Sequence, residues 1–230
     1  MGTNYTYSLA YVKGSGAGSV LSVAAASPFG VAYAMETLLQ LATPSVQNEC
    51  GGGFRVVDTP TFDHRGLLLD TGRRFFPVSL VKTTIEAMAI FKLNVLHFHL
   101  SEARFRVESK LFPQLTACPA APHVPATSCQ FYTQADVKAI VDFAYLRGVR
   151  VVAEFDMPGH STAICDALKP IGLVCCSGKW GMGQIGDDAD GNSTRIVGAL
   201  LEEMAQLFPD SVMHLGGDEC SYGATGKFTL

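Results

Sequence analysis

The sequence has few charged residues and no long hydrophobic run. Only 17% of its residues are charged, and 17 basic and 21 acidic side chains leave a net charge of −4 at pH 7. Because the basic residues are scattered, neither a nucleic-acid surface nor a polybasic membrane patch is expected. No stretch of about 18 uninterrupted apolar residues occurs, so no transmembrane helix is expected either.

Cysteine pairs of the C-x-x-C type are also missing, although the chain has seven cysteines. Cys118 and Cys129 flank a loop rich in Pro and Ala, and Cys165 precedes the pair Cys175 and Cys176 across another loop. Short loops closed by disulfides are typical of an oxidising compartment. The alternative is that these residues are buried free thiols.

Two asparagines lie in sequons for N-glycosylation, Asn4 before Tyr-Thr and Asn192 before Ser-Thr. Each sequon is weak evidence by itself, but together with the cysteines they indicate a secreted or lysosomal protein. Met1 is not followed by a basic segment and an apolar segment, as a signal peptide would be. The natural start of the protein is therefore expected to lie upstream.

With 230 residues, of which 48% are hydrophobic, the chain can bury a sizeable core in one domain or two. Near the N-terminus the pattern predicts a strand at 19–23, a helix that begins after the N-cap Ser27 and ends before Pro44, and a strand at 54–58. One helix and two strands cannot bury a core alone. Residues 1–60 are therefore interpreted as the C-terminal part of a small α/β domain.

From residue 64 onward, continuous apolar strands alternate with helices. The expected strands are 65–70, 94–100, 149–156 and 213–219, and the expected helices are 78–92, 133–146 and 193–207. Strands with continuous apolar runs are buried on both faces, and this alternation is typical of a parallel sheet with crossover helices. A doubly wound sheet is the alternative, but no Gly-rich phosphate loop follows the first strand.

The pattern predicts the α/β class, a parallel (β/α) barrel of TIM type, with about the first four strand–helix units over residues 61–230. Polar side chains follow its strands at their C-terminal ends: Glu102, Asp156, His160, Asp218 and Glu219. In such a barrel this end carries the catalytic groups. The alternatives are that the last two form an acidic turn and that His160 is structural.

Three further residues are candidates for binding. The guanidinium of Arg65 suits sugar hydroxyls or a carboxylate, or it pairs internally with Asp70. His97 and His99 are two apart in a strand and point to one face, where they could hold a metal. A metal-dependent hydrolase using His97 and His99 is therefore one alternative function.

Four segments together carry a resemblance to a known family. They are HRGLLLDT at 64–71, NVLHFHLSE at 94–102, AEFDMPGH at 153–160 and HLGGDE at 214–219. They resemble the first four barrel strands of the β-N-acetylhexosaminidases, glycoside hydrolase family 20. Residues 29–41 also resemble the helix that closes the family's preceding small domain, so the resemblance covers about residues 18–222.

The resemblance implies hydrolysis of terminal N-acetyl-β-hexosamine residues from glycans by a substrate-assisted mechanism without a cofactor. Glu219 would be the general acid and then the base. Asp218 would hold the 2-acetamido group, whose carbonyl oxygen is the nucleophile. Arg65 would bind the outer hydroxyls of the sugar ring.

The resemblance also implies a supporting network. His160, together with Glu102, would tune Glu219, and Asp156 and His99 would support that pair. The family usually has Asp where this chain has Glu102, so the pairing with His160 is the part of the site that this difference affects.

The family's second half-barrel would follow Glu219, but only eleven residues do. We expect residues 1–230 alone to be inactive. We also expect the open barrel edges to be covered by the rest of the barrel, by another copy in a homo-oligomer, or by a partner protein. A catalytically dead carbohydrate-binding or assembly protein is the non-enzymatic alternative.

Overall fold

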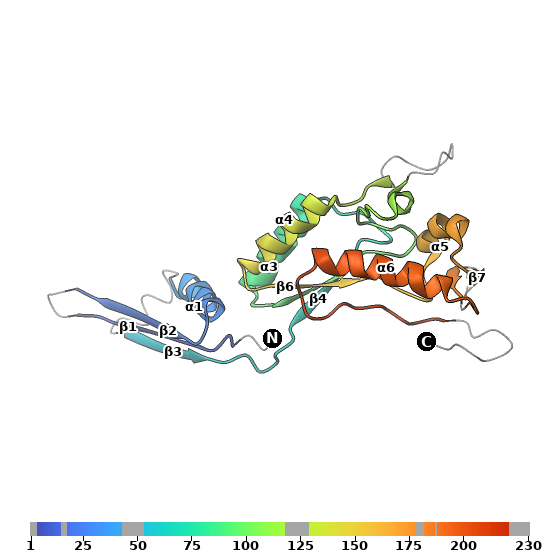
Figure 1. Ribbon diagram of the computed structural model, residues 1–230. Coiled ribbons are helices and arrows are strands. Elements are labelled where there is room, and N and C mark those ends of the chain that lie inside the picture. Colours follow the sequence, from blue (N-terminus) through green and yellow to red (C-terminus); the bar gives the residue numbers. More distant parts are fainter. Residues whose placement is uncertain are drawn as a thin grey trace.

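The computed structural model describes residues 4–14, 18–42, 53–117, 129–177, 182–186 and 188–220. Two separate sheets dominate this part of the chain (Figure 1). The first is antiparallel, in the order β2-β1-β3, and the second is parallel, in the order β4-β5-β6. Within the described residues, no helix has the length and hydrophobicity needed to cross a membrane.

The first sheet contains β1 (Tyr7–Val12), β2 (Val20–Ala25) and β3 (Gly53–Asp58), and α1 (Pro28–Leu41) packs against it. As predicted, the Ser27 side chain caps α1 by accepting a hydrogen bond from the backbone N–H of Gly30 at 3.2 Å. Strand β1 was not predicted, although it is the central strand of the sheet.

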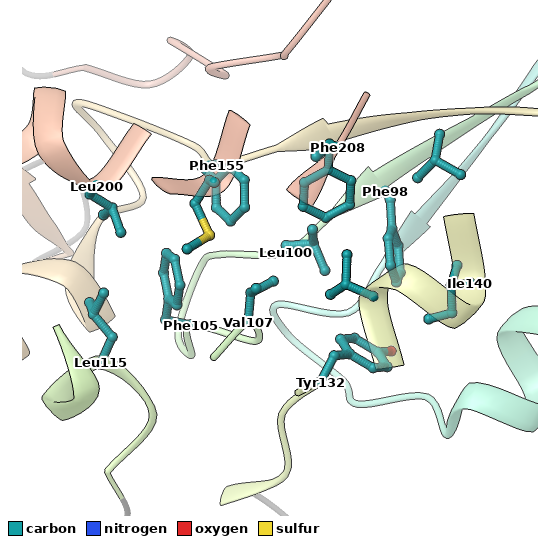
Figure 2. Packing of buried hydrophobic residues seen from close by; sticks show 14 of the residues in the cluster. Phe98, Leu100, Phe105, Val107, Leu115, Tyr132, Ile140, Phe155, Leu200 and Phe208 are labelled. Atoms are coloured by element: carbon teal, nitrogen blue, oxygen red, sulfur yellow. The ribbon is translucent and has the colours of Figure 1, made fainter. Parts of the chain in front are cut away.

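The second sheet contains β4 (Gly66–Asp70), β5 (Val95–His99) and β6 (Arg150–Glu154). Its helices are α3 (Val78–Ile90), α4 (Gln134–Tyr145) and α6 (Asn192–Leu207). Thr133 and Asp136 form the predicted capping box at the start of α4. This is part of a parallel α/β barrel, and Figure 2 shows the aromatic and aliphatic side chains that fill its core, among them Phe98, Tyr132 and Phe155.

Two of the predicted strands differ from expectation. Strand β4 is not buried on both faces, because it lies at the edge of the described sheet, and Leu67 and Leu68 are 40% and 52% exposed. Residues 213–219 do not form a regular strand. They follow β6 in a parallel direction through a single bridge between Glu154 and His214, and Leu215 is 42% exposed.

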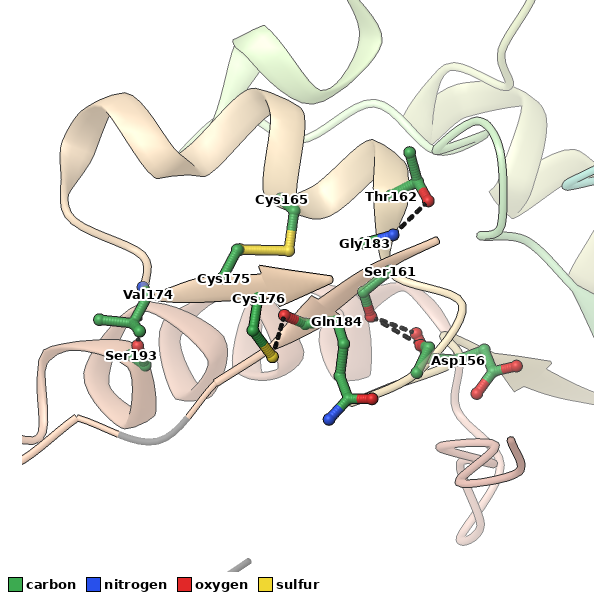
Figure 3. The surroundings of a disulfide bond; sticks show 11 residues. Asp156, Ser161, Thr162, Cys165, Val174, Cys175, Cys176, Gly183, Gln184 and Ser193 are labelled. Atoms are coloured by element: carbon green, nitrogen blue, oxygen red, sulfur yellow. Dashed lines mark hydrogen bonds between the residues drawn. A yellow bond between two sulfur atoms is a disulfide. The ribbon is translucent and has the colours of Figure 1, made fainter. Parts of the chain in front are cut away.

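A further unpredicted region follows β6 (Figure 3). It contains α5 (Thr162–Leu168), a short 3₁₀ helix (Lys169–Ile171) and a hairpin of β7 (Cys175–Ser177) and β8 (Gly183–Ile185). Another 3₁₀ helix, Pro113–Thr116, precedes α4.

The cysteines agree in part with the disulfide prediction. Cys165 in α5 is bonded to Cys175 in β7, with 5.9 Å between their Cα atoms, and this bond closes the second predicted loop. Cys129 is also disulfide-bonded, whereas Cys118 lies outside the described residues. Cys176 and Cys220 are free thiols.

Candidate active site

The carboxyl ends of the parallel strands bring the candidate residues together. Register pairs Asp70 of β4 with His99 of β5, and His99 with Glu154 of β6. The segment that carries Asp218 and Glu219 continues this order, because it lies beside β6. Parallel strands place their carboxyl ends at one edge, so side chains from four segments distant in sequence meet there.

His160 and Glu102 form the centre of the site. Both are buried, and His160 Nδ1 lies 2.9 Å from Glu102 Oε1, where it donates a hydrogen bond to the carboxylate. Burial lowers the pKa of His160, but the hydrogen bond and charge of Glu102 outweigh it and the pKa is raised. The Glu102 side chain therefore reaches His160, so the pairing that the sequence left in question is present.

The other ring nitrogen of His160 faces the two adjacent carboxylates. His160 Nε2 lies 3.2 Å from Glu219 Oε2 and 3.7 Å from Asp218 Oδ2. Among the described residues, this buried nitrogen has no hydrogen-bond partner. Asp218 and Glu219 themselves are open to solvent, with side chains 70% and 41% exposed. A buried imidazole thus contacts two carboxylates that a ligand can reach.

The two glycines before this pair are required by the close approach of Asp156. Gly216 and Gly217 have φ angles of 66° and 106°, in the left-handed region. A Cβ atom on Gly216 would lie 1.7 Å from Asp156 Oδ1, so no other residue fits there. The N–H of Gly217 donates to the same oxygen at 3.1 Å. Burial and the charge of Asp218 raise the pKa of Asp156 to about 6, against the effect of the Gly217 N–H.

His97 and His99 point to the same face, as predicted, and both contact Glu154. His97 Nε2 lies 2.5 Å, and His99 Nδ1 2.7 Å, from Glu154 Oε2. Burial raises the pKa of Glu154, but the hydrogen bond and charge of His99 and the charge of His97 lower it to about 2.

Two groups of three residues could hold a metal ion near these histidines. One group is His97, Glu154 and His214, and the other is His99, Glu102 and Asp156. His97 and His99 belong to different groups, so they do not form the shared ligand pair that the sequence suggested. Glu154 already accepts an N–H from each of them, which accounts for both rings without a metal.

Arg65 lies at the opposite end of β4 from the site. It precedes the strand, and its guanidinium donates to the carbonyl oxygens of Lys92 and Phe62, at 2.8 and 2.5 Å, and to the hydroxyl of Tyr33 at 2.9 Å. The structure therefore does not bring Arg65 to the carboxylates, nor does it pair Arg65 with Asp70. The expectation that Arg65 binds sugar does not fit this position.

Arg73 takes the place that Arg65 was expected to occupy. It follows the carboxyl end of β4, and its Nη1 lies 2.7 Å from Asp70 Oδ2 and its Nη2 3.3 Å from Glu102 Oε2. The hydrogen bond with Asp70 raises the pKa of Arg73 further, and the Arg73 side chain is 56% exposed. The sequence analysis missed Arg73, although its position three residues after a strand end was a usable signal.

A parallel α/β barrel with a histidine-backed pair of carboxylates at its carboxyl edge has the architecture of a barrel glycoside hydrolase. Residues 62–228 match the family described as "Glycosyl hydrolase family 20, catalytic domain". The chain therefore belongs to glycosyl hydrolase family 20.

Characterised proteins of this family are similar over most of the chain. The mouse beta-hexosaminidase subunit alpha is 37% identical over 208 residues, which are 87% of this chain and 38% of that protein. The human beta-hexosaminidase subunit beta is 34% identical over 204 residues, which are 84% of this chain and 35% of that protein. The chain thus spans little more than a third of the length of these relatives.

Solved structures agree with this assignment. The exo beta-N-acetylglucosaminidase of Vibrio harveyi in complex with N-acetylglucosamine is 30% identical with a TM-score of 0.76, over 95% of this chain and 37% of that chain. A mutant beta-hexosaminidase of Streptomyces plicatus in complex with the product GlcNAc is 29% identical with a TM-score of 0.74, over 93% of this chain and 44% of that chain.

Proposed function

We propose that the protein removes terminal N-acetyl-β-hexosamine residues from glycoconjugates by substrate-assisted, retaining hydrolysis. The observation that carries this proposal is the contact of Glu219 with the buried His160, 3.2 Å away, beside an exposed Asp218. Glu219 protonates the glycosidic oxygen as the leaving group departs. The acetamido oxygen of the substrate attacks the anomeric carbon and forms an oxazolinium ion, and Glu219 then deprotonates the water that opens it.

The adjacency of Asp218 and Glu219 fits this scheme. One carboxylate addresses the leaving group, and its neighbour holds the 2-acetamido group of the same sugar. No protein nucleophile is required on the opposite face of the ring, and the reaction needs no cofactor. A mechanism with a protein nucleophile would instead place two carboxyl groups about 5 Å apart on opposite sides of the bond.

The remaining site residues support these two. His160 and Glu102 form a buried pair that sets the charge beside Glu219, and Asp156 holds the turn before Asp218. We assign the binding of the ring hydroxyls to Arg73 instead of Arg65, because Arg73 lies exposed at the carboxyl edge.

His99 belongs to the supporting network and not to the surface of the sugar site. It is buried, and its Nδ1 donates to Glu154 while its Nε2 lies 3.9 Å from Glu102 Oε2. Burial lowers the pKa of His99, but the hydrogen bond and charge of Glu154 outweigh it and raise the pKa. His99 is therefore anchored by Glu154 and lies beside Glu102, the partner of His160.

We further propose that residues 1–60 are the C-terminal part of a small α/β domain and that residues 61–230 are the first half of the catalytic barrel. The family match at 62–228 supports the second boundary. A secreted or lysosomal location is supported by the disulfide between Cys165 and Cys175. The exposed edge of β4 supports its coverage by further barrel strands, a second copy or a partner protein.

The test is the release of an aryl alcohol from N-acetyl-β-glucosaminides and N-acetyl-β-galactosaminides by the full-length natural protein. Turnover of either substrate with retention of the anomeric configuration supports the proposal. Binding of N-acetylglucosamine without turnover would instead identify a carbohydrate-binding protein. Turnover that is abolished by chelation and restored by zinc would favour the metal-dependent alternative, with His97 or His99 as one ligand.

A further inference from the structure

Side chains hold the diglycine turn at two successive N–H groups. The N–H of Gly217 donates to Asp156 Oδ1 at 3.1 Å, and the N–H of Gly216 donates to His214 Nδ1 at 2.9 Å. The sequence pointed to Asp156, but it gave His214 no role. Because Glu219 follows this turn after only one more residue, the groups that fix the turn also fix the position of its carboxylate.

We propose that His214 is a positioning residue for Glu219, acting as the hydrogen-bond acceptor for the Gly216 N–H. This inference rests on the function proposed above, in which Glu219 is the acid. To accept at Nδ1, the His214 ring must be neutral and carry its proton on Nε2. The turn has left-handed backbone angles, so it depends on such contacts to keep one conformation.

The surroundings of His214 hold its ring in place. Its backbone is bonded to β6 on both sides, with its N–H donating to Ala153 O at 2.9 Å and its carbonyl accepting from the Phe155 N–H at 3.1 Å. Its ring lies against the ring of His97, with 4.7 Å between their centroids. The imidazole therefore reaches the turn from a fixed point on the sheet.

Two groups compete for His214 Nδ1. The Gly216 N–H is a donor 2.9 Å away, and Glu154 Oε1 is an acceptor 3.2 Å away. A protonated Nδ1 would donate to Glu154 and leave Gly216 without its acceptor. Among the described residues, His97 from β5 also lies against this ring, Asp156 after β6 accepts from the turn, and the Cys220 thiol donates to the carbonyl of Gly217 at 3.5 Å. The N–H groups of His97 and His99 meet the other oxygen of Glu154, Oε2, and the Gly216 N–H is the closer of the two groups at His214 Nδ1.

A matched pair of substitutions tests whether the turn needs a hydrogen-bond acceptor at the position of His214 Nδ1 or only a polar side chain at residue 214. His214→Asn places an amide oxygen near the position of Nδ1, whereas His214→Gln places it near the position of Nε2. Both are polar, and the His214 side chain is 48% exposed, so both are compatible with folding. In the full-length protein, we expect His214→Asn to keep kcat/KM within about threefold and His214→Gln to lose about 10- to 100-fold.

Two readouts distinguish positioning from a general structural role. The loss in His214→Gln should be larger for an aryl glycoside with a poor leaving group than for one with a good leaving group, because only the former depends on protonation by Glu219. The Gly216 amide should exchange with solvent at least about tenfold faster in His214→Gln than in His214→Asn. Equal kcat/KM in the two variants, or a loss independent of the leaving group, would overturn the proposal.

These outcomes are separable from a failure of the proposed function. If the wild-type protein does not turn over any aryl N-acetylhexosaminide, the proposed function fails, and amide exchange at Gly216 still shows whether His214 holds the turn. If the wild-type protein is active and His214→Gln is unchanged, only the positioning role of His214 fails.

Discussion

Nε2 of His160 lies 3.2 Å from Oε2 of Glu219, while Nδ1 of the same ring donates to Glu102. The imidazole thus connects a buried carboxylate with an exposed one. The contact joins Glu219 to Glu102 through a single buried ring, so a change at either carboxylate can be transmitted to the other through His160.

Replacing Glu219 with Gln removes the proposed acid. In the full-length protein we expect turnover of aryl N-acetyl-β-glucosaminides with poor leaving groups to fall by about 10²- to 10⁴-fold. Substrates with good leaving groups should lose much less, because their departure needs little protonation. The measurement is kcat/KM across a series of leaving groups, and an unchanged rate for the poorest one would remove Glu219 from this role.

Asp218 should matter most when the acetamide is the nucleophile. A thiazoline that mimics the cyclised intermediate should inhibit strongly, since it resembles the state that the site stabilises. We expect Asp218→Ala to weaken this inhibitor by more than it weakens N-acetylglucosamine itself. Inhibition constants for both ligands provide the comparison, and equal losses would make Asp218 a structural residue.

The pair of His160 and Glu102 predicts a pH-dependent contribution to stability. Because the pKa of His160 is raised in the folded protein, the pair stabilises the fold fully below the unfolded value of about 6.5. This stabilisation is lost as pH rises through the higher folded value. The difference in unfolding free energy between the wild type and Glu102→Gln should therefore shrink from pH 6 to pH 9. Urea unfolding measures it, and a constant difference would contradict the pairing.

The disulfide between Cys165 and Cys175 closes a loop with a sequence separation of 10 residues. A loop of this size restricts the unfolded chain by about 3 kcal/mol. We expect a Cys165→Ala/Cys175→Ala variant to lose stability of about this order in denaturant unfolding. Replacement of the free, exposed Cys176 with Ala is the matched control and should have little effect. Equal losses in the two variants would show that the bond does not form in solution.

Residues 1–230 expressed alone should self-associate and show negligible activity. In the described part of the chain β4 pairs only with β5, and it exposes 52% of Leu68. Open edges with apolar side chains promote association. Leu68→Lys should reduce the associated fraction in sedimentation velocity, whereas Leu146→Lys, at a residue 75% exposed beyond the end of α4, should not. A monodisperse, active monomer of 24.5 kDa would refute this expectation.

The strand–helix alternation of the barrel was predictable from the sequence. Each strand is a short apolar run, and each helix repeats apolar residues at helical spacing. Thr133 and Asp136 predicted a capping box, and the structure has this capping box at the start of α4. Residues that directly follow a strand could also be placed at the carboxyl edge, as Glu102 and His160 were. These inferences succeed because they depend on neighbours within a few residues.

Features that depend on contacts between residues far apart in the sequence were harder to predict. The alternating Tyr7 and Leu9 of β1 were a weak signal, because the strands that flank β1 come later in the chain. Arg65 was assigned from its guanidinium and from the resemblance of its segment to the family, and not from its end of the strand, whereas Arg73 follows the strand. The exposure of residues 213–215 depends on which elements cover them, and a local pattern carries no such information.

The contacts of Arg65 connect the two sheets mechanically. Its guanidinium joins Tyr33 of α1 to the backbone after α3, and the hydroxyl of Tyr33 donates to the carbonyl of Lys92. Deleting the first sheet and α1 would remove Tyr33. The guanidinium of Arg65 and the carbonyl oxygen of Lys92 would then lack this hydrogen-bond partner. The two sheets are therefore expected to unfold in one cooperative transition. Removing the first sheet is expected to lower the stability of the second.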